Sequence, residues 1–138
     1  LFKYSLHCFF MKVILDTNFL IYCAKEKFDY VGEIMDLLND NYDLVVPEQV
    51  VNELKSLKND KFKKVSGKDK RSSDLALQLL KVNKVKIVKP VGKSVDDAII
   101  KLSKENSKNI VATLDREMRH TLGRVILINK GRKLMLTK

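Results

Sequence analysis

The sequence predicts an α/β fold, a three-layer α/β/α arrangement around a central, mostly parallel sheet of five strands. Five short runs are nearly continuous in Val, Ile and Leu, which is typical of strands buried on both faces. Segments with helical periodicity separate these runs, and the alternation favours βαβ units with right-handed crossovers. The 138 residues are 45% hydrophobic and 32% charged, a composition typical of one globular domain.

The expected elements follow from these local patterns. The expected strands cover residues 12–15, 43–46, 85–88, 109–113 and 125–128. The expected helices cover residues 18–24 with 30–39, then 47–58, 69–82, 94–105 and 116–122. Pro47 suits the first helical position, where a missing N–H loses no partner, and Ser94 with Asp97 resembles a capping box. Residues 59–73, rich in Lys and Arg, predict a basic loop that is either a solvated connector or a phosphate-contacting flap.

The first ten residues, LFKYSLHCFF, are apolar and aromatic and lack the small-residue cleavage site of a signal peptide. We therefore expect a non-native or disordered leader at residues 1–10, a single domain at 11–138, and Met11 as the native first residue. Charged residues interrupt the N-terminal apolar run, so no membrane span is expected. Cys8 and Cys23 form no C-x-x-C motif, which argues against zinc or disulfides and favours a cytoplasmic location.

The chain is strongly basic. It carries 27 Lys and Arg against 17 Asp and Glu, a formal net charge of +10. A potential of this sign attracts a polyanion such as RNA or DNA. The alternative is that the basic residues serve solubility alone, so charge indicates a nucleic-acid partner without deciding for one.

Several acidic residues lie where the expected strands end. Asp16 ends the first strand in MKVILDTNFLIY, and Asp115 follows the fourth in NIVATLDREMR. Glu48 and Glu53 follow the second expected strand, and Asp96 and Asp97 open the expected helix before the fourth. Because the carboxyl ends of parallel strands meet at one edge of the sheet, and ligands bind there, these residues are candidates for a common site.

Most of these carboxylates also have a structural explanation. Asp16 and Asp115 are suitable helix N-caps, and acids in a first helical turn complement the positive end of the helix dipole. Glu53 is different because it lies about two turns into its helix, beyond the reach of the dipole. A partly exposed helix flank is the remaining structural explanation for Glu53.

The joint pattern points to a cation. If the first strand is central and the fourth pairs beside it, Asp16 and Asp115 emerge side by side. Glu53 and Asp97 would then approach from the two flanking helices. Clustered carboxylates repel one another and favour protonation unless a counter-ion is present. Since hard divalent cations prefer oxygen ligands, the pattern predicts a site for one or two Mg²⁺ or Mn²⁺ ions.

Four motifs occur in order along the chain: ILDTNFLI, VVPEQVVNELK, VDDAII and IVATLDREMR. Together they resemble the PIN-domain nucleases over about residues 11–129, in particular an archaeal and eukaryotic group that includes ribosomal-RNA processing factors, with VapC-type toxins as more distant relatives. The resemblance implies a PIN-like domain and a metal-dependent endoribonuclease. The acidic positions of the family match Asp16, Glu53, Asp97 and Asp115. Asp97 is preferred to Asp96 because it directly precedes AII, which matches the family pattern, and Asp96 is left as a further acid beside the ligands. The polar neighbours are Thr17, Asn18 and Thr113.

The same resemblance implies hydrolysis of phosphodiesters in single-stranded or looped RNA. The basic residues expected to follow the RNA backbone are Lys55, Lys58, Lys61, Lys63, Lys64, Arg116 and Arg119. Leu114 departs from the family pattern, because many relatives carry Asn or another polar residue there. The close match of IVATLDREMR and GRVILIN to the processing group favours that role.

Other functions stay open. A catalytically weak or inactive PIN-like RNA-binding scaffold or assembly factor shares the fold and the charge. A toxin would have a small antitoxin partner, a processing factor would act on a ribosomal-precursor particle, and many relatives form homodimers. A receiver domain is disfavoured because VKIVKPVGK has no phosphoacceptor Asp, and a D-x-D phosphatase because Asn18 replaces the second Asp. Nothing pairs a second histidine with His120, which disfavours histidine-based RNA cleavage.

Overall fold

The computed structural model describes residues 11–62 and 64–137. The strands are β1 (Met11–Leu15), β2 (Tyr42–Pro47), β3 (Lys86–Val88), β4 (Ile110–Ala112), β5 (Val125–Ile128) and β6 (Leu134–Leu136). The helices are α2 (Thr17–Lys25), α3 (Tyr30–Leu37), α4 (Glu48–Lys58), α5 (Gly67–Val82), α6 (Val95–Lys104), the 3₁₀ turn η1 (Arg116–Met118) and α7 (Arg119–Leu122). The leader expected at residues 1–10, and Lys63, lie outside the described residues.

The strands form one sheet in the order β3-β2-β1-β4-β5-β6. The first five pair in parallel, and β1 is central with β4 beside it, as the sequence predicts. The expectation of five strands is wrong by one, because β6 adds an antiparallel edge strand that pairs Ile126 with Leu136. β6 has only three residues, too few for a periodic signal in the sequence.

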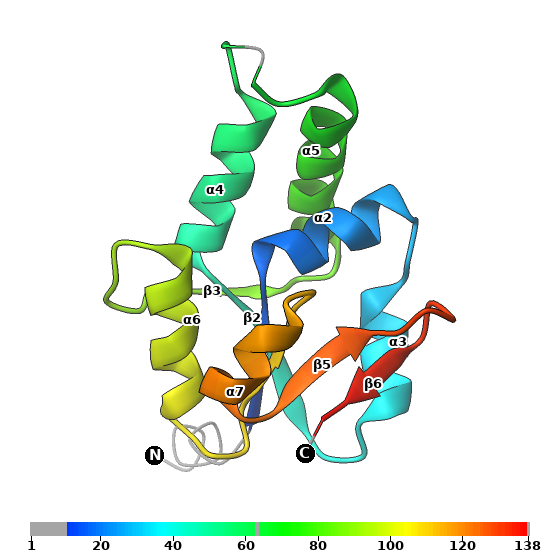
Figure 1. Cartoon of the computed structure of the whole chain (residues 1–138), viewed down its shortest axis with the longest axis vertical. Helices are drawn as coiled ribbons and strands as arrows, with labels where there is room; N and C mark the ends of the chain where they lie inside the picture. Colours follow the sequence, from blue (N-terminus) through cyan, green and yellow to red (C-terminus); the bar gives the residue numbers. More distant parts are fainter. Residues whose placement is uncertain (1–10, 63, 138) are drawn as a thin grey trace.

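Helices cover both faces of this sheet, which gives the predicted three-layer α/β/α fold (Figure 1). One layer contains α6, which packs on β1, β2 and β4, together with α7. The other contains α2, α3 and the hairpin of α4 and α5, as right-handed crossovers from β1 to β2 to β3 require. The central strand is buried on both sides, with Val13, Ile14 and Leu15 fully enclosed.

The helix starts show how local chemistry sets the boundaries. Ser94 caps α6 as predicted, because its Oγ accepts a hydrogen bond from the Asp97 N–H at 3.1 Å. Ser66 caps α5 in the same way, so that helix begins at Gly67 and takes up about half of the loop expected at 59–73. Pro47 is the last residue of β2 and the N-cap of α4 rather than its first helical residue.

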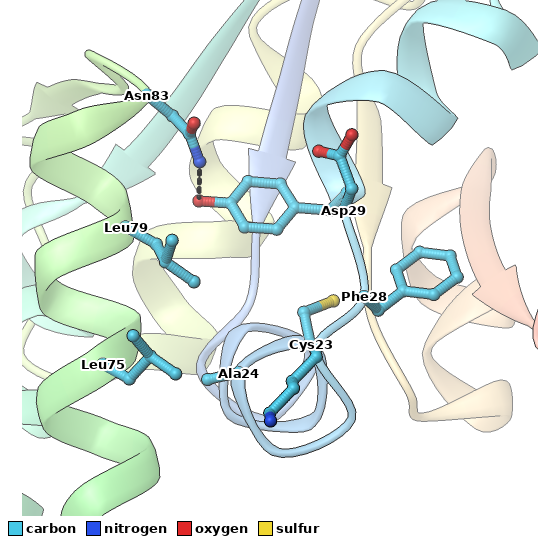
Figure 2. Close-up of a pocket in the computed structure, with 9 residues that line it drawn as sticks. Cys23, Ala24, Phe28, Asp29, Leu75, Leu79 and Asn83 are labelled. Carbon is cyan, nitrogen blue, oxygen red and sulfur yellow. Dashed lines mark hydrogen bonds between the residues drawn. The ribbon is translucent and has the colours of Figure 1, made fainter.

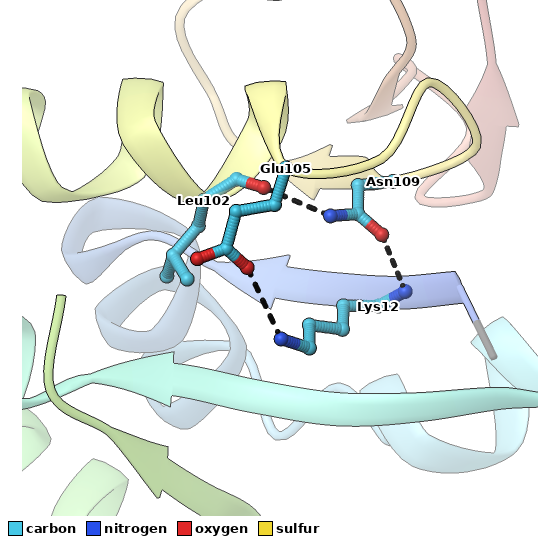
Figure 3. A network of polar contacts seen from close by, with 4 residues as sticks. All are labelled: Lys12, Leu102, Glu105 and Asn109. Atoms are coloured by element: carbon cyan, nitrogen blue, oxygen red, sulfur yellow. Dashed lines mark hydrogen bonds and ion pairs between the residues drawn. The ribbon is translucent and has the colours of Figure 1, made fainter. Parts of the chain in front are cut away.

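A buried asparagine fixes the C-terminal end of α6 against the central strand (Figure 3). The Lys12 N–H donates to Asn109 Oδ1 at 2.8 Å, and Asn109 Nδ2 donates to the Leu102 carbonyl at 2.8 Å. Lys12 Nζ also pairs with Glu105 at 3.2 Å. Because Asn109 is only 3% exposed, these bonds replace its contacts with water and hold α6 on β1.

Two ion pairs tie α5 to its neighbours. Lys58 on α4 pairs with Asp74 at 2.9 Å, and Lys25 at the end of α2 pairs with Asp69. These lysines lower the pKa of both aspartates below the usual range, chiefly through the hydrogen bonds that they donate. Within residues 11–62 and 64–137, no helix combines the length and the apolar character needed to cross a bilayer.

Candidate active site

Asp16 lies at the carboxyl end of the central strand, immediately before α2. Its N–H continues the β1–β4 pairing by donating to the Ala112 carbonyl at 3.1 Å. One carboxylate oxygen accepts from the Thr17 N–H at 2.8 Å, and the other accepts from Thr113 Oγ1 at 2.9 Å. The cap explanation for Asp16 is therefore correct, but it uses one oxygen only. With the side chain 8% exposed, the carboxylate is buried and held in one orientation.

The surroundings of Asp16 disfavour the ionised form of its carboxyl group. Burial raises the pKa of the Asp16 carboxyl above its ordinary value, and the hydrogen bonds from Thr113 and Thr17 partly oppose this. The negative charges of Asp96 and Glu53 raise the pKa further. One acid from α4 and one from α6 therefore act on Asp16; the acid from α4 is the expected Glu53, and the acid from α6 is Asp96 rather than the expected Asp97.

Thr113 links Asp16 to Asp115. Its hydroxyl donates to Asp16 and accepts from the Asp115 N–H at 3.1 Å, and its side chain is fully buried. Asp115 itself is exposed, and one of its oxygens caps η1 by accepting from the Glu117 N–H at 2.9 Å. The expectation that Asp16 and Asp115 emerge from neighbouring strands is thus met, with Thr113 as the connection.

Gln49 connects α4 to the loop that leads into α6. Its Nε2 donates to the Pro90 carbonyl at 3.0 Å and to the Gly92 carbonyl at 2.7 Å, in the loop that leads into α6. Glu53 follows Gln49 by one helical turn and lies on the same side of α4. Gln49 therefore connects the helix that carries Glu53 to the start of the helix that carries the acidic pair.

The two members of the acidic pair on α6 have different surroundings. Consecutive residues of a helix point about 100° apart, so Asp96 and Asp97 aim in different directions. The charge of Asp96 is among the causes of the raised pKa of Asp16, whereas the Cβ of Asp97 packs near Gly92. This geometry favours Asp96, although the residues that follow Asp97 favoured Asp97 in the sequence.

The predicted four-carboxylate cluster is not closed. Among residues 11–62 and 64–137, no three His, Cys, Asp or Glu side chains lie close enough together to hold a metal ion. The donor chemistry nevertheless fits a hard cation, because the side chains at this edge offer oxygen atoms and converging negative charge. The buried Thr17 Oγ1, next to Asp16, also has no hydrogen-bond partner within the described structure.

The fold agrees with comparisons to known proteins. Residues 13–129 match the family described as PIN-like domain. The chain belongs to this family. It is 37% identical over 111 residues to Ribonuclease VapC4 of Methanocaldococcus jannaschii, which covers 80% of this chain and 82% of that protein. The solved structure of the PIN domain endonuclease Utp24 matches 91% of this chain and 90% of that one, with a TM-score of 0.70 and 20% identity, a likeness in fold.

The basic residues expected to contact RNA lie in different parts of the PIN-like domain. Arg116 and Arg119 are exposed, and they lie one and four residues after Asp115. Lys55 and Lys58 are about 160° and about 140° away from Glu53 around α4, so they face the opposite flank. There they line a groove of about 720 Å³ between α4, α5 and β3. Lys61 and Lys64 are exposed beyond the end of α4.

A smaller cavity of the PIN-like domain lies between α2, α3 and α5 (Figure 2). Its volume is about 290 Å³, and it is lined by Cys23 and Tyr30, whose hydroxyl accepts a hydrogen bond from Asn83 at 3.3 Å. Burial raises the pKa of the Cys23 thiol to about 12, so almost no thiolate forms at neutral pH. This cavity therefore does not contain a reactive cysteine nucleophile.

Sequence reasoning missed Gln49 and Gly92. Gln49 has a weak signal, since it is a polar residue one turn before Glu53 on the same face of α4. Gly92 has a steric role: a Cβ there would lie 3.2 Å from Asp97 Cβ and 3.3 Å from the Ala98 nitrogen. Both residues contact the loop and first turn that lead into α6. Gln49 lies within the motif VVPEQVVNELK but was not singled out there, and Gly92 lies outside the four motifs.

Proposed function

We propose that this PIN-like domain is a metal-dependent endoribonuclease that hydrolyses phosphodiesters in single-stranded or looped RNA. The observation that carries the proposal is the Asp16 carboxylate, buried at the end of the central strand and oriented by Thr113 and Thr17. Negative charges from α4 and α6 act on the same carboxylate. Burying a charge beside like charges is unfavourable, and a divalent cation reverses that penalty.

Two further observations support RNA as the substrate. The relative from Methanocaldococcus jannaschii that is 37% identical to this chain is a ribonuclease by name. The net charge of +10 favours association with a polyanion, and Arg116 and Arg119 place exposed positive charge one and four residues after Asp115.

Asp16 and Asp115 would hold Mg²⁺ or Mn²⁺, with Glu53 and one of Asp96 and Asp97 completing the oxygen donors. The bound ion would supply an activated water and charge stabilisation for an in-line displacement at phosphorus. Thr113 fixes the orientation of the Asp16 carboxylate through its hydroxyl. The η1 cap fixes Asp115 through the bond from Glu117.

The biological setting favoured by the comparisons is that of a VapC-type toxin. The ribonuclease relative carries that name, whereas the match to Utp24 at 20% identity speaks for the fold alone. A small antitoxin protein is then the expected partner, in the cytoplasm, and homodimer formation is compatible with it. The alternative of ribosomal-RNA processing rests on the motif match in IVATLDREMR and GRVILIN.

Cleavage of a short labelled single-stranded RNA in Mn²⁺ tests the proposal. Wild-type protein should cut, and Asp16→Asn should reduce the rate by more than about 100-fold, because a lost ligand removes several kcal/mol of transition-state stabilisation. Asn retains the cap to Thr17, so circular dichroism should show an intact fold. Asp40→Asn is the matched control, since Asp40 is exposed in the loop before β2. Equal cleavage by all three proteins would contradict the assignment.

An RNA-binding scaffold is the second candidate. It is favoured by the spacing of the carboxylates, because no three of them lie close enough to hold a metal ion in the part of the chain that the structure describes. A scaffold predicts that wild-type protein binds single-stranded RNA, that Mn²⁺ produces no cleavage, and that Asp16→Asn binds as well as wild type. Cleavage lost in Asp16→Asn would exclude this candidate.

A further inference from the structure

A groove runs beside the acidic edge, between α2 and the segment that joins β4 to η1. Its volume is about 490 Å³. It is lined by Asn18, Ile21, Tyr22, Lys25, Leu114 and Asp115. Asp115 belongs both to this groove and to the candidate active site, and Asn18 follows Asp16 by two residues. A molecule in the groove would therefore extend directly from the acids.

One wall of the groove is a single face of α2. Residues 18, 21, 22 and 25 follow the spacing that places side chains on one side of a helix. The opposite side of α2 buries Phe19, Leu20 and Cys23 in the core. Tyr22 lies at the boundary: it is partly buried against the core and lines the groove as its aromatic residue.

Leu114 forms the apolar part of the other wall. It is 38% exposed although it follows the fully buried Thr113 and precedes Asp115. The family resemblance implies a polar residue at this position, so the sequence alone suggests only that Leu114 loses a polar contact. In the groove it lies with Tyr22 and Ile21, and a ligand with an apolar surface would cover all three.

The charges at the groove favour a neutral flat group over a phosphate. The Lys25 ammonium is already paired with Asp69 on α5. At the other end, the Asp115 carboxylate repels an anion. Bases of single-stranded nucleic acid stack on aromatic side chains, whatever their sequence, because every base has a π-face.

We propose that Tyr22, with Ile21 and Leu114, forms a stacking subsite for one unpaired nucleobase of single-stranded RNA next to the phosphate to be cleaved. Asn18 offers amide groups to the polar edge of that base. The subsite rests on the proposed ribonuclease function. It would make the enzyme prefer unpaired RNA, because only an unpaired base is free to stack on Tyr22. It leaves the acids free to act on the neighbouring phosphate.

Binding of fluorescein-labelled short oligouridine, oligoadenosine and a duplex RNA, followed by fluorescence anisotropy in EDTA, tests the subsite. The Asp16→Asn protein is used throughout, so that no cleavage occurs. Tyr22→Ala should weaken binding of both single strands between about five-fold and about 100-fold. Tyr22→Phe keeps the ring and should bind within about two-fold of its parent. Duplex binding should not change in either variant, because its bases are already stacked.

Tyr42→Ala is the matched control. Tyr42 is likewise partly buried, and it begins β2 at the amino-terminal end of the parallel strands, away from the acids. Thermal unfolding of each variant excludes a simple loss of fold. Unchanged single-strand binding by folded Tyr22→Ala, or an equal loss on duplex RNA, overturns the subsite while RNA cleavage by otherwise wild-type protein still supports the ribonuclease. Absence of both RNA binding and cleavage in the wild type overturns both.

Discussion

The two halves of the candidate site are built in different ways. On the sheet side, Asp16 and Asp115 follow adjacent strands, and the buried Thr113 hydroxyl bonds to both of them. On the helix side, Glu53 and Asp96 are exposed, and the Gln49 side chain links α4 to the loop that leads into α6. Strand pairing therefore fixes half of the site, whereas the other half depends on how α4 and α6 are held relative to each other.

This contrast has a consequence for metal binding. The sheet side presents a carboxylate whose orientation is set by two hydrogen bonds. The helix-side carboxylates act on Asp16 through their charge, yet no three acidic side chains meet within the described residues. We therefore expect small movements of α4 and α6 side chains to complete the donor set, while the Asp16 carboxylate stays in place.

The largest effect on stability is expected on the sheet side, from Thr113→Val. The substitution keeps the shape but leaves a buried Asp16 oxygen and the Asp115 N–H without their partner. We expect a loss of about 1–3 kcal/mol in the free energy of unfolding, measured by urea denaturation. Thr121→Val, at an exposed position of α7, should change stability by less than about 0.5 kcal/mol. Equal effects in both variants would show that the Thr113 hydroxyl is not a structural link.

Gly92→Ala should have the next largest effect, because the added Cβ would press against the first turn of α6. The new Cβ would lie 3.2 Å from Asp97 Cβ and 3.3 Å from the Ala98 nitrogen, and backbone atoms there have little room to move. We expect destabilisation of about 1–2 kcal/mol and weaker RNA cleavage. Gly67→Ala is the control, since its Cβ would meet only the flexible end of Arg71. If Gly92→Ala is as stable and as active as Gly67→Ala, α6 is not closely constrained by that loop.

Gln49→Leu should have a smaller global effect and a local one. It removes both hydrogen bonds to the loop before α6 at nearly constant volume, and we expect a loss of about 1 kcal/mol. Hydrogen exchange should increase at the start of α6 and stay unchanged near Asn109, which holds the other end. Asn109→Leu should produce the reverse pattern. Uniform acceleration along α6 in both variants would contradict separate attachments at its two ends.

The ion pairs of α5 should give the smallest effect and a defined pH dependence. Because the pKa values of Asp69 and Asp74 are lowered in the folded protein, the pairs stabilise it above an ordinary aspartate pKa of about 4. That contribution is lost as the pH falls through the lower folded values. The double variant Asp69→Asn with Asp74→Asn should therefore be less stable than wild type at pH 7 and converge with it in acid. A difference in thermal unfolding that persists at low pH would contradict this origin.

The sheet side of the site was predictable because it depends on neighbouring strands. Buried apolar runs placed β1 to β5, and central β1 beside β4 brought Asp16 and Asp115 together. Thr113 was expected as a polar neighbour, but its bonds to both acids depend on the strand register, which the sequence does not specify. The cap role of Asp16 and its site role proved compatible, because its two oxygens have different partners.

The helix side was less predictable because it depends on rotation and loop packing. Asp97 was preferred from the residues that follow it, whereas Asp96 is among the charges that raise the pKa of Asp16. The choice between the two depends on about 100° around the helix axis, which the sequence pattern does not fix. Lys55 was expected to follow the RNA backbone, and it faces the flank of α4 opposite to Glu53 for the same reason. Gln49 lies within VVPEQVVNELK, but its partners are backbone carbonyls, which any sequence supplies, so the motif did not reveal its contacts.

Binding of Mn²⁺ in solution is the most direct test of whether Asp16 and the neighbouring carboxylates share a divalent cation. Isothermal titration of wild-type protein, Asp16→Asn and the exposed control Asp40→Asn separates a specific site from diffuse attraction to acidic residues. If the carboxylates share a cation, wild type and Asp40→Asn should bind Mn²⁺ saturably, and Asp16→Asn should bind it at least about ten-fold more weakly. Equal binding by all three proteins, or no saturable binding by wild type, would contradict it.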